Sequence, residues 1–266
     1  MDRPLNAVIA DSALAFRGFN VTNLGRTPEL LQIEAYRDIV EDELERFSRV
    51  CGETVGRSVD LIEAVRSRRE FCLAGYAQSL ALVVAVEAAQ LRLLREIHQI
   101  NYADARLSFG YSLGELMALS CGGAFHAADL VRVPLAMAAD CAAMADDVRM
   151  GVLFSRGPAI QEEHVQQLCA AVTAEGNGTI GVSAILSPNT YLLIGQHNSV
   201  ARFRDVMGEL LPRQSHLRFN SQRWPPLHTP IVRQRNIPDR SSLFLETIPG
   251  GAAPPCPAVV SLATGR

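Results

Sequence analysis

The sequence has no lysine, so all 25 of its basic residues are arginine. The chain therefore cannot use a Schiff-base lysine, and it cannot form a P-loop, whose lysine contacts nucleotide phosphates. The 28 acidic residues outnumber the basic ones and give a net charge of −3. Because general nucleic-acid binding needs a basic surface, this balance argues against a nucleic-acid partner.

Long apolar runs and metal-binding patterns are also missing. The longest uncharged apolar stretch, residues 80–86, ends at Glu87 and is far shorter than the ~20 residues of a membrane helix. The N-terminus lacks the basic and apolar regions of a signal peptide. The six cysteines are scattered, with no Cys-x-x-Cys and no histidine at metal spacing. We therefore expect a reduced cytoplasmic protein with no membrane partner and no metal.

What is present is enough apolar sequence for a sizeable core, because 48% of the 266 residues are hydrophobic. Apolar spacing predicts one or two amphipathic helices over residues 30–50 and a largely buried helix over 79–97. A short strand is expected over 106–109, followed at once by a helix over 113–119. Another helix is expected to begin near Ala127.

A second rhythm follows, and it predicts the order strand, helix, strand, strand, helix, strand. The expected elements are residues 150–154, 162–174, 179–186, 191–194, 199–211 and 216–219. This βαββαβ order is the ferredoxin-like arrangement. We predict an α/β protein with a small domain at 148–220 inserted into a large domain of residues 1–147 and 221–266. From Trp224 on, the proline-rich chain is expected to be irregular apart from a strand over 258–261.

One motif carries chemistry. Residues 110–114, Gly-Tyr-Ser-Leu-Gly, match G-x-S-x-G and stand between a predicted strand and a predicted helix, as a nucleophile elbow requires. Ser112 would project at the N-terminus of the helix, where backbone N–H groups can stabilise an oxyanion. A glycine-serine turn without catalytic role fits the same five letters. The strand–turn–helix context favours the catalytic interpretation.

A serine nucleophile needs a base, and the chain offers several histidines. His228 lies in the segment Pro225–Pro230, where prolines restrict the backbone that carries the imidazole. His126 follows the elbow, but it stands at a loop-to-helix junction where a capping role explains it equally well. The remaining candidates, in polar surroundings, are His98, His164, His197 and His216.

The elbow and its surroundings resemble a known family. Residues 110–115, with Ala118-Leu119 and residues 127–132, are similar to the Gly-His-Ser-Leu-Gly-Glu region of malonyl-CoA:acyl carrier protein transacylases, the acyltransferases of fatty-acid and polyketide synthesis. Further similarities follow in the family's order along nearly the whole chain. They are residues 15–20 (the N-terminal Phe-Pro-Gly-Gln-Gly loop), Gln78 (Thr-Gln-Pro-Ala), 187–195 (the Asn-Ser-Pro hairpin), 227–230 (the catalytic histidine) and 259–265 (a later strand).

The resemblance implies a hydrolase-like parallel-sheet core with the ferredoxin-like insertion, and it implies acyl transfer from acyl-CoA to the phosphopantetheine thiol of an acyl carrier protein. No cofactor is expected, because acyl-CoA is the substrate. We expect a monomer or a component of a synthase assembly. The residues so implied are catalytic Ser112 and His228, backbone oxyanion donors Leu113 and Phe19, and pocket residues Gln78, Tyr111 and Met137.

The chain departs from the family pattern at several positions. Tyr111 replaces the histidine before the serine, and the loop at 18–20 lacks the Gln-Gly pair. Met137 stands where the family has the arginine that pairs with the malonyl carboxylate, and a thioether cannot form that pair. Losing such a pair costs ~2–5 kcal/mol, so Met137 favours an uncharged acyl group such as acetyl. The chain also ends before the relatives do.

Three alternatives remain open. A thioester hydrolase on the same fold would use water in place of the carrier thiol. A non-catalytic homologue would bind the carrier protein without needing Ser112. An ordinary α/β-hydrolase would need an acidic residue between Ser112 and His228, for which Asp129, Asp140 and Asp205 are available; the inserted ferredoxin-like pattern argues against it.

Overall fold

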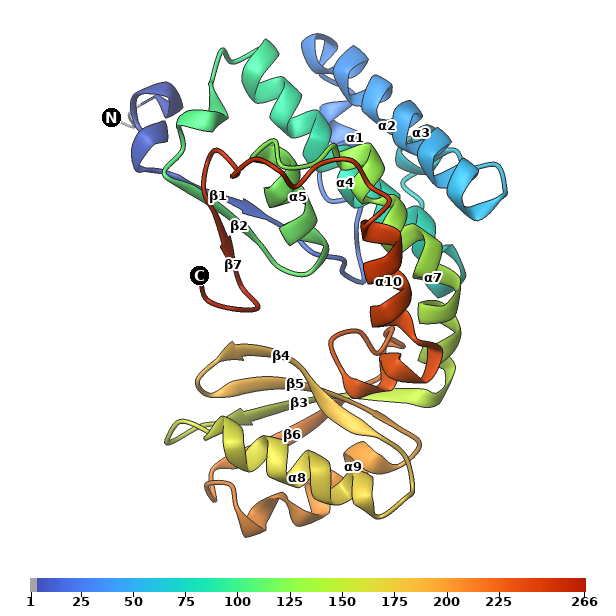
Figure 1. Ribbon diagram of the computed structural model, residues 1–266, viewed down its shortest axis with the longest axis vertical. Helices are drawn as coiled ribbons and strands as arrows, with labels where there is room; N and C mark the ends of the chain where they lie inside the picture. Colours follow the sequence, from blue (N-terminus) through green and yellow to red (C-terminus); the bar gives the residue numbers. More distant parts are fainter. Residues whose placement is uncertain (1–3) are drawn as a thin grey trace. The chain divides into compact units, whose positions relative to one another are not determined.

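The computed structural model describes residues 4–266 and divides into two compact units (Figure 1). The larger unit runs up to Ala138 and resumes at Ser241–Arg266, and the smaller unit is Ala139–Arg240. The smaller unit is thus longer than the predicted 148–220 on both sides. It takes in the 3-10 helix Pro230–Arg235 because that helix packs against the sheet at Gly181. A salt bridge between Arg240 and Asp140 joins the two ends of the smaller unit.

The larger unit contains a parallel sheet of three strands in the order β1-β2-β7. The strands are β1 (Ala13–Phe16), β2 (Leu107–Gly110) and β7 (Val259–Ser261). Phe16 is level with Gly110, and Gly110 is level with Ser261. The loops that follow β1 and β2 therefore begin at the same edge of the sheet, which is where α/β proteins build their sites.

Helices make up most of the larger unit. They are α1 (Thr27–Leu30), α2 (Glu34–Val55), α3 (Leu61–Arg66), α4 (Tyr76–Glu96), α5 (Leu113–Cys121) and α6 (Ala127–Leu130), with 3-10 turns at Leu5–Ala7, Ile9–Asp11, Leu73–Gly75 and Tyr102–Asp104. Two more, α7 (Arg132–Met144) and α10 (Ile237–Leu245), run across the boundaries of the units. Helix α4 packs against α2, and α5 packs on β1 and β2 (Figure 1).

Helix α4 is the core helix of the larger unit. Leu82, Val83 and Ala85 are almost completely buried. Within residues 4–266, the segment Leu73–Glu96 alone is long and apolar enough to cross a membrane by length and composition, but 61% of its apolar window is buried inside the protein. Burial of that kind is expected of a core helix, as the sequence predicted for this stretch.

The smaller unit has an antiparallel sheet in the order β4-β5-β3-β6, with two helices on one face (Figure 1). Leu153, Leu193 and Phe203 are among the buried side chains between sheet and helices. This is the predicted ferredoxin-like arrangement. Its elements are β3 (Val148–Ser155), α8 (Glu162–Ala174), β4 (Ile180–Ser187), β5 (Thr190–Gln196), α9 (Ser199–Val206) and β6 (Ser215–Asn220), with 3-10 turns at Ala145–Asp147 and Met207–Glu209.

Two expectations about helices were wrong. The helix predicted over 199–211 ends at Val206 and continues only as the 3-10 turn Met207–Glu209. Residues 237–245, expected to be irregular, form α10. Proline fits the first turn of a helix, so Pro238 does not interrupt α10. Among the residues of α10 only Ile237 is recorded as buried, which explains why no apolar pattern indicated a helix there.

Candidate active site

Ser112 occupies a strained backbone conformation between β2 and α5. Its φ is 55° and its ψ is −114°, and it caps the N-terminus of α5. A non-glycine residue rarely adopts a positive φ, and such a conformation costs of order ~1–3 kcal/mol that the surroundings must supply. Ser112 is therefore held where an unconstrained serine would not stay, as in the sharp turn that the G-x-S-x-G motif predicts.

The two glycines of the motif are required by backbone contacts. A Cβ on Gly110 would lie 2.1 Å from the carbonyl carbon of Gly114. A Cβ on Gly114 would lie 2.3 Å from the carbonyl oxygen of Phe16 and 2.8 Å from that of Arg17. Because these neighbours are backbone atoms, no side-chain movement can make room. The turn at Ser112 is thus wedged against the end of β1.

The loop after β1 lies beside this turn. The N–H of Tyr111 donates to the carbonyl oxygen of Phe16 at 3.3 Å. A Cβ on Gly18 would come within 2.6 Å of the carbonyl oxygen of Tyr111. Phe19 packs edge-on against the ring of Tyr76 at the start of α4, with ring centroids 4.8 Å apart. The structure therefore brings Phe19, Tyr111, Ser112 and the first turn of α4 into one neighbourhood of the larger unit.

Leu113 is the first residue of α5, and the N–H groups of a helix's first turn have no acceptor within the helix. Its N–H follows directly on Ser112. This is the local arrangement expected of an oxyanion donor, in which the helix dipole favours negative charge at the same point. Leu113 itself is 5% exposed, so the side chain is anchored in the core while the backbone forms the turn.

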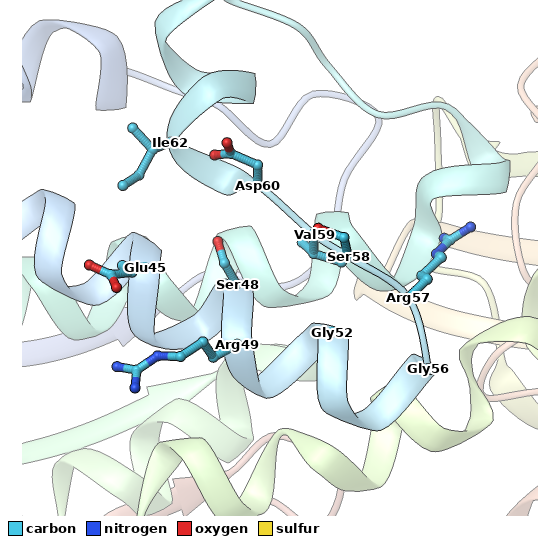
Figure 2. Close-up of a pocket in the computed structure, with 10 residues that line it drawn as sticks. All are labelled: Glu45, Ser48, Arg49, Gly52, Gly56, Arg57, Ser58, Val59, Asp60 and Ile62. Atoms are coloured by element: carbon cyan, nitrogen blue, oxygen red, sulfur yellow. The ribbon is translucent and has the colours of Figure 1, made fainter.

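Gln78, in the first turns of α4, accepts a hydrogen bond from the guanidinium of Arg57 at 2.9 Å. Arg57 also lines a surface pocket of about 690 Å³, formed by the end of α2, the following loop and the start of α3 (Figure 2). None of the predicted site residues lines this pocket. Its buried hydroxyl, Ser48, is already bonded to the N–H of Leu61 at 3.0 Å, so we do not assign chemistry to it.

Met137 and Tyr111 differ in exposure. Met137 is buried in α7, whereas Tyr111 is 41% exposed. The part of the Tyr111 side chain that is shielded from solvent is enough to raise the pKa of its phenol. The guanidinium of Arg132, one turn and more from Met137, bonds to Glu53 at 2.7 Å and to Thr54 at 3.3 Å. These partners hold Arg132 against α2.

His228 belongs to the smaller unit, whereas the other six predicted site residues belong to the larger one. Its φ is 61°, and its side chain is exposed. The neighbouring backbone is anchored on both sides: Ser183 donates to the carbonyl oxygen of Leu227 at 2.9 Å, and Thr229 donates to that of Pro226 at 2.6 Å. The chain therefore presents His228 from a segment fixed to β4.

The four buried cysteines are not nucleophiles. Burial raises the pKa of Cys51 to about 11 and that of Cys121 to about 12, and it also raises the pKa values of Cys141 and Cys169. Thiols of this kind are protonated and inert near neutral pH. Within residues 4–266, no group of three or more histidine, cysteine, aspartate or glutamate side chains is arranged to hold a metal ion.

Glu87 is a feature that sequence reasoning missed. It is 4% exposed in the middle of α4, and its Oε1 accepts the N–H of Arg17 at 2.7 Å. Burial raises the pKa of Glu87 to about 8, although the bond from Arg17 opposes this. A signal was available: Glu87 is the one charged residue in the stretch 71–91, which overlaps the helix predicted to be buried over 79–97.

This pKa predicts how stability depends on pH. Between the ordinary value of 4.5 and about 8, the folded protein holds the Glu87 proton more tightly than the unfolded chain does. The free energy of unfolding must then fall as pH rises through this window. Glu87→Gln removes the titrating carboxyl and with it this contribution to the pH dependence. We expect the free energy of unfolding of Glu87→Gln to rise relative to that of the wild type between pH 5 and 8. The difference should be of the order of a few kcal/mol, since each pKa unit corresponds to about 1.4 kcal/mol.

Urea unfolding of both proteins between pH 5 and 9 measures this difference. The charged groups lining the same pocket as Glu87, namely Arg17, Arg26 and Glu29, are present in both proteins. Glu96→Gln is the matched control on α4, because Arg92 lowers the pKa of Glu96 and confines its effect to acid pH. Parallel stability curves for wild type and Glu87→Gln would contradict the prediction.

Comparisons with known proteins agree with this architecture. No family model matches the sequence, and no curated protein matches it either. Among solved structures, FabD from Acinetobacter baumannii has a TM-score of 0.67 and 18% identity, over 93% of this chain and 71% of that one. MCAT from Streptococcus pneumoniae has a TM-score of 0.69 and 20% identity, over 94% of this chain and 73% of that one.

A third match is a complex, described as a type II PKS acyl-carrier protein with its malonyl-transacylase (PlMCAT:AntF). It has a TM-score of 0.68 and 21% identity, over 93% of this chain and 73% of that one. At identities this low, the structural matches establish a common fold and nothing more specific. With its parallel sheet and its separate antiparallel sheet, the chain has the fold of the malonyl-CoA:acyl carrier protein transacylases, as the resemblance in its sequence predicted.

Proposed function

We propose that this protein is an acyltransferase that moves an acyl group from acyl-CoA to the phosphopantetheine thiol of an acyl carrier protein, in fatty-acid or polyketide synthesis. The observation that carries the proposal is the conformation of Ser112, with φ 55° and ψ −114°, between β2 and α5. Strain of this kind persists at functional sites, where the surrounding structure imposes it. The transacylase fold of the matched structures supports the same reaction.

In the first half of the reaction, the Oγ of Ser112 attacks the thioester carbonyl carbon, and His228 takes the hydroxyl proton. The negative oxygen of the tetrahedral intermediate is stabilised by the N–H groups of Leu113 and Phe19. Collapse of the intermediate breaks the carbon–sulfur bond. The CoA thiolate leaves with the proton from His228, and the acyl group stays on Ser112 as an ester.

In the second half, the carrier thiol attacks this ester and gives its proton to His228. The second tetrahedral intermediate uses the same two N–H groups and collapses with cleavage of the bond to Oγ. His228 returns the proton to Ser112, and the acyl group leaves as a thioester of the carrier protein. In this scheme the anchored backbone of residues 226–229 orients His228.

The acyl group is proposed to be uncharged. Met137 replaces the arginine to which the family binds the malonyl carboxylate, and Arg132 is bonded to Glu53. A buried carboxylate without a cationic partner carries a large desolvation cost. Tyr111, in place of the family histidine, adds a neutral wall beside Ser112. An acetyl group meets both conditions, whereas a malonyl group does not.

An equimolar mixture of malonyl-CoA and acetyl-CoA tests this proposal. We expect intact-mass analysis to show one acetyl group per chain, on Ser112, and at least ~10-fold less malonyl, since a missing charge pair is worth ~2–5 kcal/mol. Addition of a phosphopantetheinylated carrier protein should then move the acetyl group to the carrier.

Each other outcome points to a different reaction. Stoichiometric malonylation without acetylation contradicts the assignment of Met137. Release of free acid with no acylated carrier indicates a thioester hydrolase. No acyl mass on the chain from any acyl-CoA indicates a non-catalytic protein that binds the carrier.

A further inference from the structure

The loop after β1, residues 17–24, lacks the Gln-Gly pair of the transacylase pattern and is held instead by two carboxylates, the buried Glu87 and the half-buried Glu70. At its start, the N–H of Arg17 donates to Oε1 of Glu87 at 2.7 Å. At its end, the N–H groups of Asn23 and Leu24 donate to the two oxygens of Glu70 at 2.8 and 3.0 Å. Both ends of the loop are therefore fixed by carboxyl oxygens rather than by strand pairing.

Hydrogen bonds within the loop complete the arrangement. The guanidinium of Arg17 donates to the carbonyl oxygen of Thr22 at 2.9 Å and to Oδ1 of Asn23 at 3.2 Å. Asn23 accepts the N–H of Asn20 at 3.0 Å and donates to its carbonyl oxygen. Phe19, at the tip of the loop, thus lies within a network of hydrogen bonds that begins at the Arg17 N–H.

If stability were the only requirement, a buried carboxyl would be an unfavourable acceptor for a single N–H group, because its burial costs free energy. The Glu87 side chain is 4% exposed, and its second oxygen, Oε2, has no hydrogen-bond partner within residues 4–266. Glu87 lines a pocket of about 400 Å³ together with Arg17, Arg26 and Gln90. Apolar side chains fill neighbouring positions of α4, and a half-satisfied carboxyl buried among them carries a desolvation cost that they do not.

The bond between Glu87 and Arg17 also bears on the elbow. The carbonyl oxygen of Arg17 lies against Gly114, and the next residue, Gly18, lies against the carbonyl oxygen of Tyr111. The N–H of Arg17 shares its peptide group with the carbonyl of Phe16, which accepts the N–H of Tyr111 and lies against Gly114. Rotation of that peptide would therefore disturb the turn at Ser112 and displace the start of the loop that carries the Phe19 N–H. A peptide flip that removes one oxyanion donor lowers a rate by about 10²–10³-fold.

We propose that Glu87 is a positioning residue that fixes the Phe16–Arg17 peptide at the start of the loop after β1, and through the loop keeps the Phe19 N–H facing the oxyanion formed at Ser112. This inference rests on the proposed acyl transfer. Glu87 touches no reacting atom and acts through the loop. A pKa near 8 fits the role, because below that pH the neutral carboxyl accepts the Arg17 N–H without a buried charge.

The test compares four proteins: wild type, Glu87→Gln, Glu87→Leu and the control Gln90→Leu, whose exposed side chain lines the same pocket without bonding the loop. For Glu87→Leu we expect kcat for acylation of Ser112 by acetyl-CoA to fall about 10²-fold with KM changed less than about threefold, as for a lost transition-state interaction. Below pH 8, Glu87→Gln should retain kcat within about threefold, because its amide oxygen still accepts the N–H.

Hydrogen exchange of the Arg17 amide gives a second measurement, which does not depend on enzymatic activity. We expect protection in the wild type and in Glu87→Gln, and exchange at the rate of an open loop amide in Glu87→Leu. Wild-type kcat in Glu87→Leu, an equal loss in Glu87→Gln, or an unprotected Arg17 amide in the wild type overturns the inference. If the wild type acylates normally while these results appear, acyl transfer stands and only the role of Glu87 falls; a wild type that is never acylated removes both.

Discussion

Replacing Ser112 with alanine should abolish acylation of the chain and reduce transfer to the carrier protein by at least ~10³-fold, as expected when a nucleophile is removed. Replacing it with glycine should abolish acylation equally, but with a gain in stability. Glycine adopts φ 55° and ψ −114° without a Cβ clash, so Ser112→Gly should raise the free energy of unfolding by about 1–2 kcal/mol. Intact-mass analysis and urea unfolding measure the two effects.

Ser120→Ala is the matched control for this pair. Ser120 lies on the same helix, α5, and its buried hydroxyl has no hydrogen-bond partner among residues 4–266. Its loss should change neither acylation nor stability by much. If Ser112→Ala were acylated like the wild type, the nucleophile would be elsewhere. If Ser112→Gly were less stable than Ser112→Ala, the turn would not be strained as described.

Gly114→Ala is expected to be among the most damaging single methyl additions in the larger unit. The new Cβ would lie 2.3 Å from the carbonyl oxygen of Phe16 and 2.7 Å from its carbonyl carbon, so α5 or β1 must move. Overpacking of this kind costs ~1–3 kcal/mol or more. Because the displaced atoms carry the β1 loop and Ser112, we also expect at least ~10²-fold less acylation, the loss that follows a missing oxyanion donor.

Gly208→Ala provides the comparison for a harmless methyl group. A Cβ at Gly208 meets no heavy atom within 4 Å, and the position lies in the smaller unit. Its free energy of unfolding should stay within about 0.5 kcal/mol of the wild type, as for most surface substitutions. A Gly114→Ala protein as stable and active as Gly208→Ala would show that the elbow does not press on β1.

The fold was largely predictable because its signals are local. Turn residues such as Gly176-Asn177-Gly178 and Ser187-Pro188-Asn189 separate apolar runs in the second half of the chain, and these runs became β4 and β5 as expected. The elbow carries its own signature, since the glycines at 110 and 114 are required by the backbone contacts found there. Local chemistry and tertiary contacts agree at these positions.

What could not be predicted depends on contacts between distant residues. Nothing near Glu87 in the sequence indicates that its partner is the backbone of Arg17, 70 positions earlier. Glu70 likewise binds the loop from 47 and 46 positions away. The helix α10 was missed because too few of its side chains are buried to leave an apolar pattern. The roles assigned to Ser112 and Met137 remain predictions that the experiments above test, and the role assigned to His228 remains a prediction.

The burial of four thiols limits how the chain can react with a thioester in the absence of catalysis. Acyl-CoA acylates amines and thiolates spontaneously, yet the chain has no lysine, and of its cysteines only Cys72 and Cys256 are exposed. Alkylation of those two thiols removes the exposed thiolates, and the adducts that imidazoles form with thioesters hydrolyse readily. A stable acyl adduct on an interior position of such a blocked chain then indicates an activated hydroxyl.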